Sequence, residues 1–210
     1  MSFEVFRPRP VADEFAHIYL EEGQEKTHGG LLQLMDLLAG PGRLLESWSP
    51  LQVYVSDVRK PRPDFWYPNF GDAEYVVTDG VRSALEADCD LTGDVEFLPL
   101  ACPDVAESLW LMHAINWPNV LEESRCTYDE TTDGLVIAEF IPSRLGDCSL
   151  FKVQPVRDSP SGDLLTVVNS DDPEHGFKPL VERSGFSGLR FELVWSSSGE
   201  PLPFEPTLGS

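Results

Sequence analysis

Histidine and cysteine are the side chains best suited to hold a metal ion or to act as a nucleophile. No two of them have the HxxxH, HxH or CxxC spacing that brings a pair of ligands onto one ion. They are scattered along the chain, at His17, His28, His113 and His175, and at Cys89, Cys102, Cys126 and Cys148. We therefore expect no metal site, and we expect reduced, buried cysteines rather than disulfides. His113 lies in an apolar stretch, which favours a hydrogen-bonded core histidine.

One cluster of acidic side chains could bind a cation, because Asp171, Asp172 and Glu174 lie beside His175. Acidic residues in a solvated loop more often form an exposed turn, so we favour the turn. The nucleophile motif GxSxG and the phosphate-binding motifs GxGxxG and GxxxxGK followed by Ser or Thr are absent. The sequence therefore predicts neither an enzyme nor a cofactor, although acid and base residues from distant positions could still meet in an active site.

The charge of the chain is strongly acidic and unevenly distributed. Its 15 basic and 36 acidic residues give a net charge of −21, of which residues 71–210 carry −18 and residues 1–70 only −3. Such a field repels nucleic acid and anionic membranes and attracts a basic protein. The alternative is that the charge serves solubility alone. The chain begins with a charge and Pro8 where an export signal needs an apolar segment, and no apolar run is long enough to span a membrane, so we expect a cytoplasmic protein.

The elements that would position these residues are dominated by one pattern used twice. Residues 75–100 and 165–195 each contain a β-branched strand, an amphipathic helix, a turn of small residues and a second strand. The two turns align as Leu91-Thr92-Gly93 and Phe186-Ser187-Gly188. The repetition predicts a mixed α/β fold in which two similar strand–helix–strand units contribute to one or two mixed sheets.

We expect three regions along the chain. Residues 1–62 would form an N-terminal α/β segment that packs on the main domain, residues 63–196 would form that domain, and the proline-rich residues 197–210 would form an extended or disordered tail. Further expectations are a strand at 3–6 that ends at Pro8 and Pro10, a buried segment at 31–38, a strand at 51–55, a central strand at 108–117, an exposed connection at 119–134, and strands at 134–140 and 149–153.

An aromatic loop lies between residues 60 and 71, where three prolines exclude regular structure. Four aromatic residues occur within six positions, namely Phe65, Trp66, Tyr67 and Phe70. These rings could bind a partner, or they could cover the core where a long loop crosses it. We favour the second interpretation, because aromatic side chains are usually buried.

Several short motifs follow one another in a specific order between residues 63 and 195. The most specific is the last, 185–192, a glycine-flanked turn that leads into an arginine–aromatic strand. The others are Pro63-Asp64-Phe65, Val76-Val77-Thr78-Asp79, Val95-Glu96-Phe97-Leu98-Pro99, Ile115-Asn116-Trp117, Leu121-Glu122-Glu123-Ser124, Ile141-Pro142-Ser143-Arg144-Leu145 and Ser149-Leu150-Phe151-Lys152-Val153. In this order they resemble immunity protein family eleven of bacterial polymorphic toxin systems, formerly a domain of unknown function.

The resemblance implies a cytoplasmic bacterial antidote that binds a cognate toxin stoichiometrically, with no cofactor, nucleic acid or membrane as partner and no catalytic residues. A basic toxin would be captured faster by complementary charge. Two alternatives stay open, a small enzyme that reverses toxin-inflicted damage and an acidic mimic of nucleic acid. By ordinary interface anatomy we expect acidic contacts around aromatic anchors, namely Glu122, Glu123, Asp129, Glu130, Asp171, Asp172 and Glu174 with Trp66 and Tyr67.

Overall fold

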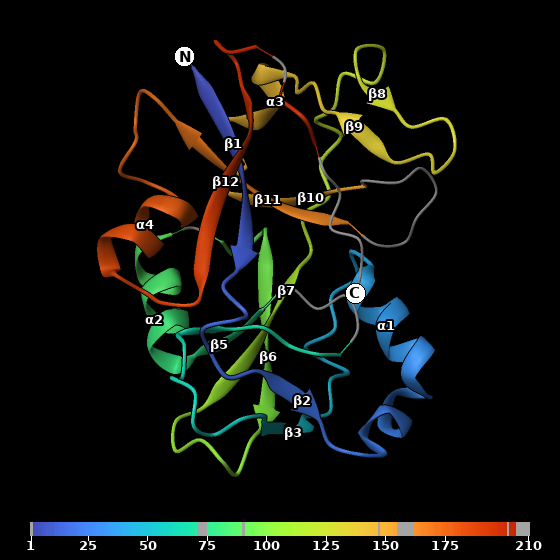
Figure 1. Cartoon of the computed structure of the whole chain (residues 1–210), viewed down its shortest axis with the longest axis vertical. Coiled ribbons are helices and arrows are strands. Elements are labelled where there is room, and N and C mark those ends of the chain that lie inside the picture. The colour runs from blue at the N-terminus through green and yellow to red at the C-terminus, as the bar shows by residue number, and fades with distance from the viewer. Residues whose placement is uncertain are drawn as a thin grey trace.

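The computed structural model describes residues 2–70, 75–89, 91–146, 148–154, 162–200 and 202–204. Two large β-sheets lie one above the other in Figure 1, with helices α2 and α4 on the left and helix α1 on the right. A small two-stranded sheet stands at the upper right. The fold is mixed α/β, as the sequence predicts.

The lower sheet in Figure 1 contains the first of the two repeated units. Its strand order is β2-β3-β6-β7-β5-β4. The strands are β2 (Ile18–Leu20), β3 (Leu51–Val55), β4 (Phe65–Trp66), β5 (Tyr75–Thr78), β6 (Val95–Ala101) and β7 (Leu109–Ala114). Helix α2 (Asp79–Asp88) joins β5 to β6, and these two strands run parallel because both pair antiparallel with β7, which lies between them.

The upper sheet contains the second unit and has the order β10-β11-β1-β12. Its strands are β1 (Phe3–Pro10), β10 (Leu150–Val153), β11 (Asp163–Asn169) and β12 (Leu189–Ser196). Helix α4 (Phe177–Ser184) joins β11 to β12, which are parallel because both pair antiparallel with the intervening β1. The two units therefore have the same topology in separate sheets, and each takes its middle strand from outside the strand–helix–strand segment.

The first 62 residues belong to both sheets. Strand β1 is the middle strand of the second unit, while β2 and β3 extend the lower sheet. Between β2 and β3 the chain forms the 3-10 helix η1 (Gln24–His28) and helix α1 (Leu31–Ala39). Residues 1–62 are therefore not a separate segment packed against a finished domain. Without β1, the upper sheet would lose the strand that pairs with both β11 and β12.

Strand β1 is longer than expected, because Pro8 and Pro10 do not end it. Among the described residues, the second half of β1 pairs with β12 alone, so its opposite edge has no ladder partner there. The Val11 N–H points toward β12, because it donates to the Gly188 carbonyl. Backbone groups alternate between the two edges of a strand, so the backbone nitrogens of Pro8 and Pro10 face the open edge. A missing N–H there breaks no ladder hydrogen bond. On that edge the Pro8 carbonyl accepts a hydrogen bond from the Tyr75 hydroxyl.

Helix α1 lies on the surface, and the expectation of a buried segment at 31–38 is wrong for three of its five leucines. Leu34 and Leu38 are fully buried against the lower sheet, whereas Leu31, Leu32 and Leu37 are exposed. A helix that packs on one sheet buries only one stripe of its surface. Leucines at nearly every position must therefore leave some of them facing solvent.

Several local predictions are confirmed. The strand at 51–55 is β3, the apolar stretch 108–117 contains β7, and the stretch 149–153 contains β10. His113 is fully buried, and its Nε2 lies 3.0 Å from the Gly42 carbonyl oxygen. Phe65 and Trp66 of the aromatic loop are buried, as the core-covering interpretation predicts.

The expected tail and polar connection contain more structure than the sequence suggests. The polar connection includes β8 (Thr127–Tyr128), and β9 (Leu135–Ile137) follows, ahead of the short helix α3 (Pro142–Leu145). Phe204 is buried, and its N–H donates to the Val136 carbonyl over 2.6 Å. Residues 202–204 therefore pack against β9, while residues 201 and 205–210 of the expected tail lie outside the described residues.

Candidate functional site

The loop between β8 and β9 is held by its own hydrogen bonds. The Asp129 carboxylate accepts from the Thr131 N–H at 2.9 Å and from the Thr132 N–H and hydroxyl at 2.8 and 3.0 Å. The Asp129 N–H donates to the Gly134 carbonyl at 2.8 Å, and Asp133 closes the turn with φ of 53°. The loop is therefore ordered by local contacts before any partner binds.

These hydrogen bonds divide the acidic residues of the loop into two roles. The N–H groups of Thr132 and Thr131 hold the pKa of the Asp129 carboxyl below its usual range, because they stabilise its charged form. Asp129 therefore serves chiefly to shape the turn. Glu130 and Asp133 have exposed side chains on the same loop, so they are the carboxylates that the turn presents to solvent.

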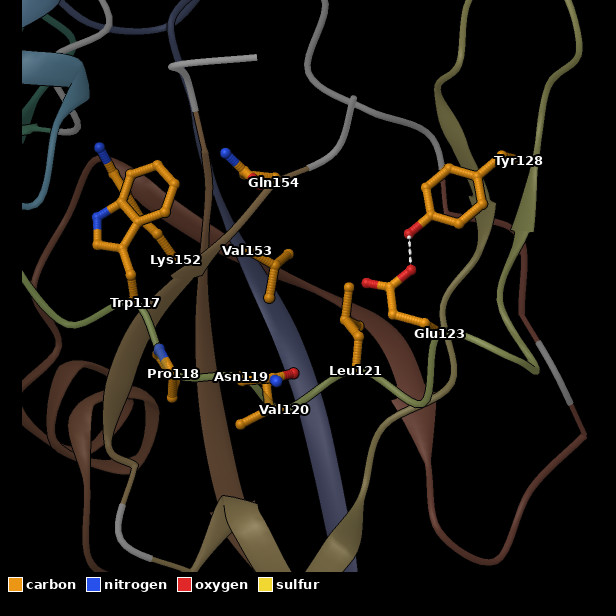
Figure 2. Close-up of a pocket in the computed structure, with 10 residues that line it drawn as sticks. All are labelled: Trp117, Pro118, Asn119, Val120, Leu121, Glu123, Tyr128, Lys152, Val153 and Gln154. Carbon is orange, nitrogen blue, oxygen red and sulfur yellow. Dashed lines mark hydrogen bonds between the residues drawn. The ribbon is translucent and has the colours of Figure 1, made fainter. Parts of the chain in front are cut away.

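A cavity of about 360 Å³ lies beside this hairpin, and Figure 2 shows its lining. On one side the Tyr128 hydroxyl donates to the Glu123 carboxylate at 2.8 Å. On the other side are Trp117 and Lys152, whose Nζ lies 5.5 Å from the indole centroid. The remaining lining residues are Pro118, Asn119, Val120, Leu121, Val153 and Gln154.

The cavity combines a carboxylate, amide groups and apolar side chains, which is a set suited to binding. The Lys152 side chain is 1% exposed and packs toward the aromatic wall. Burial raises the pKa of the nearby Cys126 thiol, which favours the protonated form over a reactive thiolate. Among the residues that the structure describes, no three His, Cys, Asp or Glu side chains come together to hold a metal ion.

The second predicted acidic cluster lies far from the first. Asp171, Asp172 and Glu174 are exposed in the connection from β11 to α4, where the Asp172 carboxylate lies 2.6 Å from His175 Nδ1. Figure 1 places this connection at the left edge of the upper sheet and the β8–β9 hairpin at the right. The structure therefore does not bring the two clusters together into one surface. Glu122 and Glu123 lie at the hairpin end, with Glu122 half-buried and Glu123 exposed.

The two predicted aromatic anchors differ in exposure. Trp66 is 1% exposed in the core of the lower sheet, so it is not a surface anchor. The reason is that both residues of β4 are covered when the aromatic loop crosses that core. Tyr67 is half-buried and lies edge-on to His17, with ring centroids 5.7 Å apart.

Two features that bear on function could not be predicted from the sequence. The first is Lys152, a buried cation at the cavity, for which the apolar neighbours in β10 give no charge signal. The second is the set of exposed leucines on α1. Their run of apolar residues was visible in the sequence, but it predicted burial, because periodicity cannot say how many sides of a helix are covered.

A scan against models of known protein families finds no match to this chain, and searches of curated proteins and of solved structures find none. Within the described ranges, no helix is long and apolar enough to cross a membrane.

Proposed function

We propose that this protein is an immunity protein that binds a cognate antibacterial toxin in the bacterial cytoplasm and blocks it stoichiometrically. The observation that carries the proposal is the β8–β9 hairpin, an acidic loop ordered by the three hydrogen bonds to Asp129. A loop that is already ordered loses little conformational entropy on binding. The order of motifs that resembles immunity protein family eleven supports the same function.

The charge of the chain suggests how a toxin would be captured. With a net charge of −21, the protein attracts a basic partner over a distance and accelerates encounter. Glu123 and Glu130 at the hairpin are exposed and available for direct contact. Asp171 and Glu174 lie on the other side of the upper sheet, so they contribute to the long-range field or to a separate contact.

A second candidate function follows from the cavity of about 360 Å³ next to the hairpin. A small enzyme that reverses toxin-inflicted damage would need a pocket with converging polar groups. Asn119 is one of its polar lining residues, and Glu123 and Lys152 lie on opposite sides of it. The inhibitor is favoured because the charged groups of the cavity lie apart, with the Glu123 carboxylate accepting from the Tyr128 hydroxyl and Lys152 beside the Trp117 ring.

The first test is growth rescue combined with co-purification. The protein encoded beside this gene would be expressed in a sensitive host with and without this chain. Rescue with a stable one-to-one complex supports the inhibitor. Rescue without a complex supports the enzyme, and a harmless neighbour that does not co-purify contradicts the proposal. Capture of several unrelated DNA-binding proteins, with binding that falls steeply with salt, would instead indicate a nucleic-acid mimic.

Charge reversal then maps the interface. Glu123→Lys with Glu130→Lys should slow toxin association about tenfold at low salt. Asp171→Lys with Glu174→Lys should slow it by a similar factor only if the second cluster also takes part. The control is Asp13→Lys with Glu14→Lys, which makes the same change in net charge at exposed positions elsewhere. Equal association rates for the hairpin variant and this control would remove the hairpin from the interface.

A further inference from the structure

Exposed leucines gather on helix α1 and the connection that follows it. We define the α1 surface as Leu31, Leu32, Leu37 and Leu45, whose exposed fractions are 49, 72, 39 and 52%. Only four other large apolar side chains among the described residues are exposed, and they come from different elements, at Tyr54, Val58, Val136 and Leu193. Clustered exposed apolar residues usually indicate an interaction site, whereas single ones are ordinary.

Helix α1 lacks the features that stabilise a helix facing water. Its N-cap is Gly30 without a side-chain hydrogen bond, and its first turn has no acidic residue and its last turn no basic residue. Asp36 is its only charged residue, although charged residues make up 24% of the chain. The helix is held instead by Leu34 and Leu38, which are fully buried against the lower sheet. Its outer face is therefore firmly positioned, with the exposed side chains of Leu32 and Leu37 on either side of Gln33 and Asp36.

The segment that contains helix α1 carries a small negative charge. Acidic side chains near it in the chain are Glu22, Glu25, Asp36 and Glu46, against the cations Lys26 and Arg43. An apolar centre with a charged rim is the usual anatomy of an interface. A second copy of this chain would bring a net charge of −21 against another of −21, which opposes self-association.

The position of α1 connects it to the proposed toxin interface. Figure 1 shows α1 and the β8–β9 hairpin along the same flank of the molecule, with α1 beside the lower sheet and the hairpin beside the upper one. The acidic connection at 170–176 lies on the opposite flank. A partner steered toward the acidic hairpin therefore approaches the flank that carries the exposed leucines.

We propose that the α1 surface is the apolar anchor of the toxin interface and takes a basic amphipathic segment of the toxin. This inference rests on the proposed function. The hairpin carboxylates steer the partner, and the leucines supply the short-range contact by burying their exposed area. Leu32 is the most exposed of them, so its loss should weaken the complex most.

The test compares two double variants. Leu32→Gln with Leu37→Gln removes apolar area from the α1 surface, and Val58→Gln with Leu193→Gln removes exposed apolar side chains elsewhere. Calorimetry with the toxin should give a Kd at least about tenfold weaker for the first variant and within about twofold for the second. Thermal melts should show that both variants remain folded, since the substituted side chains are exposed.

A second probe makes the result independent of the toxin. It is a synthetic helical peptide with leucine on one face and lysine on the other, and its control has glutamate in place of lysine. The lysine peptide should bind the wild-type chain and bind the α1 variant at least about tenfold more weakly. The glutamate peptide should not bind, because like charges repel.

The outcomes separate the inference from the proposed function. A toxin complex that forms with equal affinity for the wild type and the α1 variant overturns the inference and leaves the inhibitor standing. If no toxin binds, the proposed function fails, and the lysine peptide alone decides whether the α1 surface accepts a basic amphipathic segment. A wild-type dimer that the α1 variant abolishes in sedimentation would make this surface a self-interface and overturn the inference.

Discussion

The two repeated units have one topology but are held together differently. In the first unit, β5 and β6 flank the nearby strand β7, whose side chains are mostly apolar and buried. In the second unit, β11 and β12 flank β1 from the other end of the chain. That sheet buries an ion pair, since Arg7 and Asp163 are 2 and 6% exposed and lie 2.9 Å apart, whereas the buried Glu96 carboxylate of the first unit accepts from the Leu44 and Leu45 N–H groups.

The same sequence pattern can therefore be completed either by a neighbouring strand or by a strand from the far end of the chain. The first unit closes locally, because β7 follows β6 after a short connection. The second unit must join strands separated by more than 150 positions, which is a slower and entropically costlier closure. The buried ion pair between Arg7 of β1 and Asp163 of β11 is a directional contact that favours β1 as the strand in this gap.

The largest expected effect is a difference in stability between substitutions in the two turns that align in the sequence. Gly188 has φ of 99°, and an added Cβ would lie 2.1 Å from the Phe65 carbonyl oxygen. Gly188→Ala should therefore lower the free energy of unfolding by about 4 kcal/mol or prevent folding. The equivalent Gly93 has nothing within 4 Å of an added Cβ. Gly93→Ala should therefore change the free energy of unfolding by less than about 1 kcal/mol. Urea denaturation measures the stability of both variants, and equal losses of stability would contradict the difference expected between the two turns.

The next effect concerns the buried charges of the second unit. Asp163→Asn removes the carboxylate nearest to the buried Arg7 guanidinium, leaving Glu192 at 4.0 Å, and should cost about 3 kcal/mol in unfolding free energy. Arg7→Met with Asp163→Leu should be less destabilising than the single change, because both charges are removed. A double variant as unstable as the sum of Arg7→Met and Asp163→Leu made singly would show that the two side chains do not interact. Thermal unfolding of these variants provides the comparison.

A smaller effect is expected at the contact between the units. The Asp94 carboxylate, 7% exposed, accepts from the Leu150 N–H at 2.9 Å, the Ser149 N–H at 3.2 Å and the Asn116 amide at 2.7 Å. It thereby links the turn of the first unit to β10 of the second sheet. Asp94→Asn should cost about 2 kcal/mol in unfolding free energy. Hydrogen exchange should then show faster opening of β10, and unchanged protection there would contradict this role.

The smallest effect compares the starts of the two helices. The Thr78 hydroxyl caps α2 by accepting from the Val81 N–H, whereas α4 starts at Gly176 without a side-chain cap. Thr78→Ala should cost about 1 kcal/mol in unfolding free energy. Ser83→Ala, at an exposed position of the same helix, serves as the control and should leave stability unchanged within about 0.5 kcal/mol. A loss at Ser83 equal to that at Thr78 would show that capping is not the cause.

Much of the local structure could be predicted because it depends on short-range periodicity. The strands at 51–55 and 149–153 and the apolar stripe of α2 follow from which positions are apolar. The candidate site could be predicted only in part. Glu123 and Glu130 are exposed near one cavity, but Trp66 is buried, and the cluster from Asp171 to Glu174 lies on another flank.

Residue types and spacings within about 30 positions are enough to predict the repeated strand–helix–strand units, the mixed α/β class and the strong negative charge. Long-range packing, in contrast, places β1 in the second unit, covers Trp66 and leaves Leu32 exposed. Periodicity says that a segment has an apolar face, but which element covers that face depends on contacts between residues far apart in the chain.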